Sequence, residues 1–301
     1  MDRFSELEVF TSIIEQGSFT DAARKLGLSK SVVSKQITAL EARLGVTLLN
    51  RTTRQVQPTE IGEEFYRQSK SVLSNLQLAE EYVSSQQSTI RGKLRITAAN
   101  DFGVNQLADP VSKFLCEHSD VKIEMKLENQ FVDIVAENFD LAFRIGNLSD
   151  SSLKARKIAE TQTSVLASPD YIKKHGAPRS LAEIVEHDVL QYSNMQGESV
   201  WRVSDSVGQI QHIPINANFT VNDGKSLLKA AIAGVGLTIL PCFVYTEALK
   251  SGQLVKILPE FEPATMGVYI VYPPSDYIPP KTRAFIDFMV TAFKGKGMEN
   301  W

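Results

Sequence analysis

The sequence predicts two kinds of fold in one chain: an all-α winged helix-turn-helix at the start, and an α/β body joined to it by one long helix. Two amphipathic helical patterns meet at Gly27, residues 59–88 carry an apolar seam, and strand-like and helix-like segments alternate from residue 92 onward. A chain of 301 residues with 43% hydrophobic and 22% charged residues is long enough for two or three ordinary globular domains.

The first 58 residues predict three short helices. An apolar stripe of helical spacing runs from Phe4 to Ile14, and Ser18 and Ser29 are placed to cap a second and a third helix. Gly27 supplies the turn between those two helices. The residues expected to pack in the small core are Ala22, Ala23, Leu26, Val33, Ile37, Leu40 and Leu44.

The remaining faces of the third helix carry polar and cationic side chains near its N-terminal end. A helix-turn-helix presents such side chains to the DNA major groove. Base contacts are therefore expected from Ser31, Ser34, Lys35 and Gln36. Residues 46–59 follow as two strand-like runs around a cationic tip, which predicts a wing. Phosphate contacts are expected from Lys30, Arg51 and Arg54.

Charge is unevenly distributed along the chain. The net charge is −3, but residues 20–58 hold seven Lys and Arg against two acidic residues, a local excess of five. Residues 92–301 hold 21 basic against 24 acidic residues. A basic module on a mildly acidic body fits a protein that binds a phosphate backbone through its first segment.

Residues 59–88 predict one long helix. Its seam follows steps of four and three residues and is apolar except at Ser69, which is typical of a coiled coil. Dimerisation is expected through Phe65, Val72, Leu76, Ala79 and Val83. The alternative is a helix packed along its own chain. The polar segment 84–89 then predicts a hinge, which divides the chain into residues 1–58, 59–91 and 92–301.

The α/β part predicts two subdomains with a ligand cleft. Strands are expected in residues 92–99, 121–128, 140–146, 164–169, 188–192, 215–221, 236–241 and 267–274. Helices are expected in residues 104–116 and 131–138, near 171 and 181, from 225, and in 281–293. Such alternation predicts mostly parallel sheets. The chain is expected to leave the first subdomain (92–162) for the second (163–264) and to return through 265–294.

Several motifs together resemble a known family. They include "GSFTDAARKLGLSKSVVSKQITALEARLGVTLLNR", "PTEIG", "ENQFVDIVAENFDLAFRIGNLSDSSL", "AAIAGVGLTILP" and "VYPPSDYIPPKTRAFIDFM". The chain resembles LysR-type transcriptional regulators over nearly its whole length, and its regulatory part is similar to the branch that includes CrgA. The resemblance implies that the third helix reads DNA, that the long helix dimerises, and that a periplasmic-binding-protein-like domain binds a small-molecule effector.

Three junctions between a strand and the segment after it are candidates for the effector site. Helix N-termini favour anions, and open α/β sheets bind ligands beyond the carboxyl ends of their strands. The expected residues are Ala99, Asn100, Phe102, Asn129, Gln130, Phe131, Arg144, Tyr192 and Asn222. Family members often bind carboxylates here, using hydroxyl side chains where this chain has Ala98 and Ala99, so Asn100 is the expected donor.

The character of that site stays open at this point. Asp101, Glu128 and Asp223 lie near the same junctions and would repel an anion, so the charge of the effector is undecided. The three asparagines also fit a purely structural role in turns and helix caps.

Other functional classes receive less support. The sequence has no P-loop, no H-E-x-x-H pair and no G-x-S-x-G elbow, and its four histidines are scattered, so neither an enzyme nor a metal or cofactor is expected. Cys116 and Cys242 are expected to be buried, inert thiols. The alternatives kept are a thiol redox-responsive regulator using these cysteines, and an α/β enzyme that binds a small molecule.

The start of the chain lacks a secretory pattern, and the most apolar window, residues 227–245, is interrupted by Gly and Pro. A cytoplasmic protein without a membrane span is therefore expected. The partners expected are double-stranded promoter DNA, a small-molecule effector of which a carboxylate is one candidate, and further copies of the chain in a homotetramer, a dimer of dimers. RNA polymerase is a further partner that the resemblance allows.

Overall fold

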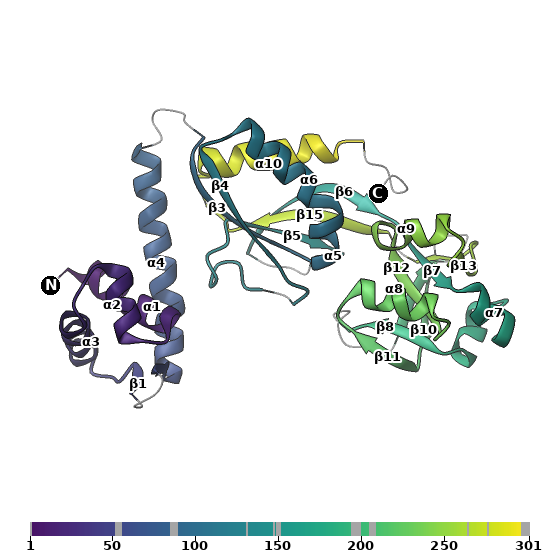
Figure 1. Cartoon of the computed structure of the whole chain (residues 1–301), viewed down its shortest axis with the longest axis horizontal. Helices are drawn as coiled ribbons and strands as arrows, with labels where there is room; N and C mark the ends of the chain where they lie inside the picture. The colour runs from purple at the N-terminus through teal and green to yellow at the C-terminus, as the bar shows by residue number, and fades with distance from the viewer. Residues whose placement is uncertain are drawn as a thin grey trace. The chain divides into compact units, whose positions relative to one another are not determined.

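The computed structural model of the chain describes residues 2–51, 56–84, 90–130, 132–146, 148, 152–193, 200–204, 209–263, 265–275 and 277–295. The chain divides into two compact units, which are described separately below and can be followed in Figure 1. The first unit holds residues 1–88 together with 133–138, and the second holds residues 89–132 and 139–301.

The first unit is a small helical domain with a two-stranded wing and a long helix. Its elements are α1 (Arg3–Gln16), α2 (Phe19–Leu26), α3 (Lys30–Leu44), β1 (Leu49–Arg51), β2 (Val56–Pro58) and α4 (Glu60–Ser84). The Ser18 side chain accepts from the Asp21 backbone N–H, and the Ser29 side chain accepts from that of Val32, which confirms both predicted caps. Gly27 ends α2 with a φ of 67°, a left-handed conformation that glycine adopts without a side-chain clash.

The core of this unit lies where α1, α2 and α3 meet. Phe10, Ile13, Ile37 and Leu40 are fully buried there, and each such side chain contributes about 1.5–3 kcal/mol. The Phe65 ring of α4 lies 5.3 Å from that of Phe10, measured between ring centroids. Leu44 was expected in this core but is 37% exposed, because it lies in the last turn of α3, beyond the helices that cover the earlier residues.

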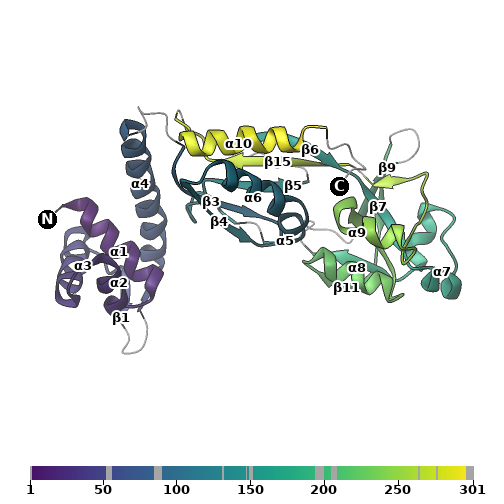
Figure 2. The same ribbon diagram turned by 45° about the horizontal axis from the view of Figure 1, so that its top comes forward.

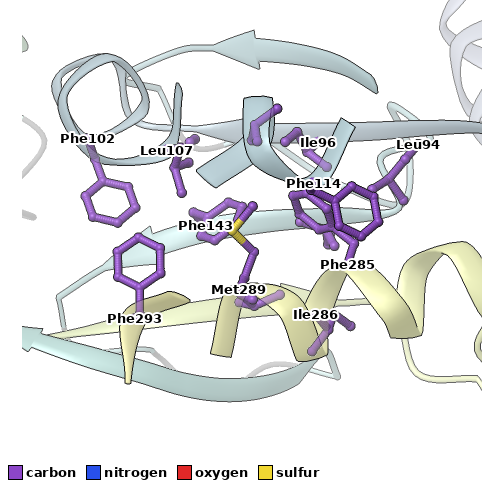
Figure 3. Packing of buried hydrophobic residues seen from close by; sticks show 14 of the residues in the cluster. Leu94, Ile96, Phe102, Leu107, Phe114, Phe143, Phe285, Ile286, Met289 and Phe293 are labelled. Atoms are coloured by element: carbon purple, nitrogen blue, oxygen red, sulfur yellow. The ribbon is translucent and has the colours of Figure 1, made fainter. Parts of the chain in front are cut away.

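The first lobe of the second unit is a five-stranded sheet with helices on one face (Figure 2). Its elements are β3 (Gly92–Ala98), α5 (Asn100–Phe102), a π-helical turn (Gly103–Leu107), α6 (Ala108–Glu117), β4 (Val121–Leu127), β5 (Leu141–Ile145), β6 (Lys154–Thr161), β15 (Met266–Tyr272) and α10 (Pro280–Phe293). The strand order is β4-β3-β5-β15-β6. Aromatic rings of α6 and α10 fill the space above the sheet, where Phe114 and Phe285 lie 5.0 Å apart edge to face (Figure 3).

The second lobe has its own five-stranded sheet, in the order β11-β8-β12-β7-β13. Its elements are β7 (Thr163–Ala167), α7 (Pro169–His175), a 3-10 helix (Leu181–Glu186), β8 (Val189–Tyr192), β11 (Ala217–Val221), α8 (Gly224–Ile232), β12 (Leu237–Pro241), α9 (Cys242–Lys250) and β13 (Val255–Lys256). A small antiparallel sheet holds β10 (Ile210–Pro214), β9 (Val200–Ser204) and β14 (Glu262–Pro263), in that order.

The prediction of mostly parallel sheets is confirmed for strand direction, since one strand in each large sheet, β15 in the first and β7 in the second, runs against the other four. In each large sheet three neighbouring strands are parallel, and the other two strands pair antiparallel. The antiparallel pairs involve β6, β7 and β15, which carry the chain between the lobes: β6 leads through Gln162 alone into β7, and β15 brings the chain back. A parallel pair needs a crossover, usually a helix, that returns the chain to the start of the next strand, and β6 and β7 are joined without one.

The helix predicted over residues 131–138 is wrong. Residues 134–138 form turns, and Phe131 lies outside the described residues. The Asp133 carboxylate accepts from the backbone N–H groups of Val135 and Ala136, at 3.0 and 3.1 Å. Asn138 ends the segment with a φ of 54°, which no helix continues through.

Candidate functional site

The N-terminal half of α3 presents a polar, cationic surface. Lys30, Ser31 and Lys35 are exposed and Ser34 is half-buried, while Val33 and Ile37 of the same helix are in the core. α3 therefore shows these four side chains on faces that the domain leaves open. Because an α-helix has 3.6 residues per turn, the residues that point into the core determine which residues point outward and can contact a ligand.

Most of the cationic side chains that the structure describes in this unit form ion pairs within it. Arg24 pairs with Asp21 at 3.0 Å, Lys25 with Glu15 at 2.9 Å, and Arg43 with Glu6 at 2.6 Å.

Lys30 and Lys35 have no ion pair with any residue in the part of the chain that the structure describes. Their charges are therefore available to a phosphate or to a guanine edge.

Ser31 and Gln36 also make contacts within the domain, and for Gln36 these contradict the expected role. The Ser31 hydroxyl lies 2.9 Å from that of Ser29, so it belongs to the capping group at the start of α3. The Gln36 amide donates to the Ser5 hydroxyl of α1 at 3.4 Å, and its Oε1 is buried without a partner among the described residues. Gln36 thus points toward α1, and we withdraw its predicted base contact.

Sequence reasoning misses Val32 and Glu41. Val32 is 39% exposed on the open side of α3. An exposed branched side chain there is suited to contact the methyl group of thymine. Glu41 accepts from the backbone N–H groups of Leu48 and Leu49, at 2.8 and 3.2 Å, and so ties the start of the wing to α3.

The wing is a two-stranded antiparallel ribbon. Leu49 pairs with Pro58 and Arg51 pairs with Val56 in its register. Arg54 and the side chain of Arg51 lie outside the described residues, so their phosphate contacts stay predictions.

The predicted seam of α4 has two parts. Phe65 packs against Phe10 and is half-buried, so it attaches α4 to the helical core, and its part in a dimer interface stays a prediction. Further along, Val72 is 44% exposed, Ala79 is exposed and Leu76 is half-buried. The side chain of Val83 lies outside the described residues.

In the second unit, two of the three candidate junctions lie at the carboxyl ends of β3 and β4. These strands are parallel, and Ala98 pairs with Leu127 at their ends. The Asn129 side chain accepts from the backbone N–H of Asn100 at 2.9 Å. The Asn100 side chain lies near Asp223, at the start of α8, and helps to lower the pKa of that carboxyl. The structure thus brings all three junctions together, with Asn100 at the centre.

Other predicted effector residues have mixed positions. Tyr192 and Asn222 are half-buried at the ends of the neighbouring parallel strands β8 and β11, and Ala99 is half-buried beside Asn100. Gln130 is exposed. Arg144 donates to the Val132 carbonyl at 2.9 Å, and burial lowers the pKa of its guanidinium.

Phe102 is a correction. It is fully buried among Phe143, Phe243 and Phe293, with ring centroids 5.5–6.2 Å away, and so forms part of the protein core instead of an effector-binding wall.

Two carboxyl groups at these junctions have shifted pKa values. Burial raises the pKa of Asp101, and the charge of Asp223 adds to that effect. Hydrogen bonds from Ser226 lower the pKa of Asp223, because its hydroxyl and backbone N–H both donate to the carboxylate, at 2.7 and 2.9 Å. Sequence reasoning placed both residues near the site but could not show that they face one helix end.

The two cysteines differ from each other. Cys116 is exposed, which contradicts its predicted burial: α6 is amphipathic, and this residue lies on its outer face. Cys242 is buried as predicted, with its Sγ 3.2 Å from the Thr161 hydroxyl.

Among the residues described, no three His, Cys, Asp or Glu side chains gather as metal ligands would. None of the described helices is both long and apolar enough to span a membrane.

Comparison with protein families gives two matches that together cover most of the chain. Residues 4–63 match the family described as "Bacterial regulatory helix-turn-helix protein, lysR family". Residues 87–294 match the family described as "LysR substrate binding domain". A small DNA-binding-type module followed by a two-lobed α/β binding domain is the architecture of a ligand-responsive transcriptional regulator. The chain belongs to the LysR family.

Individual relatives agree. The chain is 32% identical to the HTH-type transcriptional regulator CrgA of Neisseria meningitidis serogroup C, over 95% of each chain. It is 30% identical to the HTH-type transcriptional activator AaeR of Escherichia coli, over 97% of this chain and 94% of that protein.

Solved structures give the same result. The structure of CrgA from N. meningitidis covers 97% of this chain and 99% of its own, with a TM-score of 0.60 and 30% identity. The full-length Vibrio cholerae virulence activator AphB covers 96% and 99%, with a TM-score of 0.64 and 28% identity. These matches confirm the predicted fold class and a regulator instead of an enzyme.

Proposed function

We propose that this regulator binds promoter DNA sequence-specifically through α3 and that a small-molecule effector in its α/β domain modulates the binding. The observation that carries the proposal is the pair Lys30 and Lys35, exposed and without an ion pair among the described residues, beside serine hydroxyls on the N-terminal half of α3. A helix that enters the major groove uses that half to contact base edges.

Each residue of the surface is assigned a role by its chemistry. Ser31, Ser34 and Lys35 contact base edges, and Val32 contacts a thymine methyl group. Lys30, with Arg51 and Arg54 of the wing, contacts phosphates, which fix the register of the protein on the duplex.

The assembly proposed is a homotetramer built as a dimer of dimers. The exposed Val72 and Ala79, with the half-buried Leu76, form a seam along α4 that a second copy covers, and Val83 belongs to it by its position in the sequence. Two such pairs place four winged domains on paired half-sites, and RNA polymerase is a further partner of the bound assembly.

The effector site proposed lies around Asn100, where the ends of β3 and β4 meet the start of α8. Asn129, Tyr192 and Asn222 surround it, and ligands of open α/β sheets bind at such strand ends. The domain division that goes with this proposal is residues 1–58, 59–91 and 92–301.

Selection of duplexes from a random pool by the purified chain tests the proposal. Recovery of one recurring, two-fold related sequence is expected, because a symmetric dimer presents two copies of α3. The selected duplexes are then titrated with and without metabolite fractions, to detect the effector by its change in affinity. A pool that remains random after repeated rounds would contradict sequence-specific binding.

The exposure of Cys116 favours a second candidate, in which oxidation of this thiol regulates DNA binding. The buried Cys242, close to Thr161, is a less accessible partner. Peroxide treatment of the wild type and of Cys116→Ser, followed by DNA titration, decides between the two. A peroxide effect that is lost in the variant supports thiol regulation, and an equal response in both proteins excludes Cys116.

A further inference from the structure

Two carboxyl groups from different lobes meet at the N-terminus of α8 (Gly224–Ile232). Asp223 belongs to the second lobe and caps the helix by accepting from Ser226. Asp101 comes from α5 in the first lobe, and its Oδ2 lies directly against Gly224 at the start of α8. The helix end that would otherwise attract an anionic ligand therefore already has two carboxyl groups of the chain itself beside it, and one of them accepts from the Ser226 amide.

Asp101 is held closely in this position. It is only 7% exposed, and a Cβ atom added at Gly224 would lie 2.6 Å from its Oδ2, so Gly224 leaves the room that the carboxyl needs. Two further contacts between the lobes lie nearby. The Phe102 and Phe243 rings meet edge to face at 5.5 Å, and the Asn105 side chain donates to the Phe243 carbonyl at 3.1 Å.

One oxygen of the Asp101 carboxyl has no hydrogen-bond partner among the described residues. This oxygen is Oδ1, and it is buried. A buried acceptor without a partner is costly, since it has lost its water and gained nothing in return. A donor that reached Oδ1 would remove this cost.

This inference rests on the proposed effector function and specifies its ligand. We propose that Asp101 is a resident anion at the N-terminus of α8, and that the effector binds through an amine or hydroxyl that donates to Asp101 Oδ1, not through a carboxylate. The domain thus selects against the anions that a bare helix end would attract.

The surrounding charges support this ligand class. Asp223 is the other acidic group at the helix end, and Lys225 on α8 is the nearby cation. Glu128, after β4, is already paired with Lys126 at 2.7 Å. A ligand carboxylate would face two carboxyl groups, whereas an ammonium or hydroxyl group would meet an acceptor without a partner.

The first test compares two small probes on the full chain, sodium formate and methylammonium chloride, with sodium chloride at equal ionic strength as reference. In the wild type, methylammonium should raise the melting temperature above the reference and formate should not. In Asp101→Ala the order should reverse, because formate fills the vacated anion site. A shift of about 2–4 °C is expected if formate restores most of a lost helix cap.

Two further variants serve as controls. Asp101→Asn keeps the shape and loses the charge, so it should respond to neither probe. Gly224→Ala keeps both acidic residues, but its methyl group displaces the Asp101 carboxyl. This substitution should therefore lower the melting temperature of the wild type. In the Asp101→Ala background it should leave the melting temperature unchanged or raise it.

The proposal is overturned if both probes act alike on the wild type and Asp101→Ala, or if Gly224→Ala has the same effect in both backgrounds. DNA titration of the same preparations reports separately on the proposed regulatory function, because the probe preference is measured without DNA.

Discussion

Lys35 and Lys30 have similar exposure and no ion pair among the described residues, yet their places on α3 give them different roles. Lys35 is exposed in the second turn of α3, next to Ser34, and its long side chain can reach a guanine edge from there. Lys35→Ala should therefore cost about 1–3 kcal/mol on the preferred duplex and much less on a scrambled one. Fluorescence anisotropy on both duplexes measures the difference, and equal losses would rule out base readout by Lys35.

Lys30 provides the matched comparison, because it begins α3 and is assigned to a phosphate. Lys30→Ala should weaken binding to all sequences alike, and the slope of log K against log salt should fall in magnitude by about 0.9. Titrations at several salt concentrations measure that slope. A loss confined to the preferred duplex would instead make Lys30 a base-reading residue.

Asp101 gives the folded chain a distinct pH dependence. Because burial and the charge of Asp223 raise its pKa, the folded state binds more protons than the unfolded state between the ordinary and the raised pKa. The free energy of unfolding therefore falls as pH rises through this window. Asp101→Asn should remove that fall, as measured by denaturation between pH 4 and pH 7. Parallel curves for both proteins would contradict the shift.

At the scale of helices, Glu15 joins three of them. This residue of α1 pairs with Lys25 of α2 at 2.9 Å and with Lys70 of α4 at 2.9 Å. Burial alone would raise its pKa, but the hydrogen bonds and charges of the two lysines outweigh burial and lower it. The long helix is thereby attached to the winged domain by charge as well as by Phe65.

The ion pairs of Glu15 predict a contribution to stability that depends on pH. Glu15→Gln should lower the free energy of unfolding at neutral pH by up to about 1 kcal/mol, because the group is partly exposed. Because the pKa of Glu15 is lower in the folded than in the unfolded state, its ion pairs stabilise the fold at pH values above the ordinary pKa. This stabilisation is lost as the pH falls through the pKa of the folded state. Thermal denaturation should show the two proteins converging in acid. A difference that persists at low pH would mean that packing, not charge, is what the substitution disturbs.

The seam of α4 can be tested separately from the fold. Val72 is exposed in the single chain, so Val72→Lys should leave the chain folded but weaken its association with a second copy. Glu63→Lys serves as a control, since nine residues place it on the opposite face of the same helix. Light scattering on both variants measures the association. Equal oligomer size in Val72→Lys and wild type would contradict the seam.

Over the whole molecule, features that depend on neighbouring residues could be predicted from the sequence, whereas features that depend on distant segments could not. Ser18, Gly27 and Ser29 mark helix ends through their own backbone chemistry, so these ends are visible in the sequence. The direction of β6 and β15 depends on how the chain crosses between lobes, which no local pattern encodes.

The candidate site shows the same division. Its junctions were predictable from strand ends, but the approach of Asp101 to Gly224 joins segments more than 120 positions apart and needed the structure. Phe102 was expected to contact the effector because it lies close to Asn100 in the sequence, but its ring is buried in the core.

The most direct test of the account is the ratio of two dissociation constants of the purified chain at physiological salt, one for its selected duplex and one for a scrambled duplex of the same length. Sequence-specific regulators typically show a ratio of about 1,000 or more. We expect a ratio of that order for the wild type and a clear reduction for Lys35→Ala. A ratio near one for the wild type, with or without added metabolites, would contradict the assignment of α3 as a reader of DNA sequence.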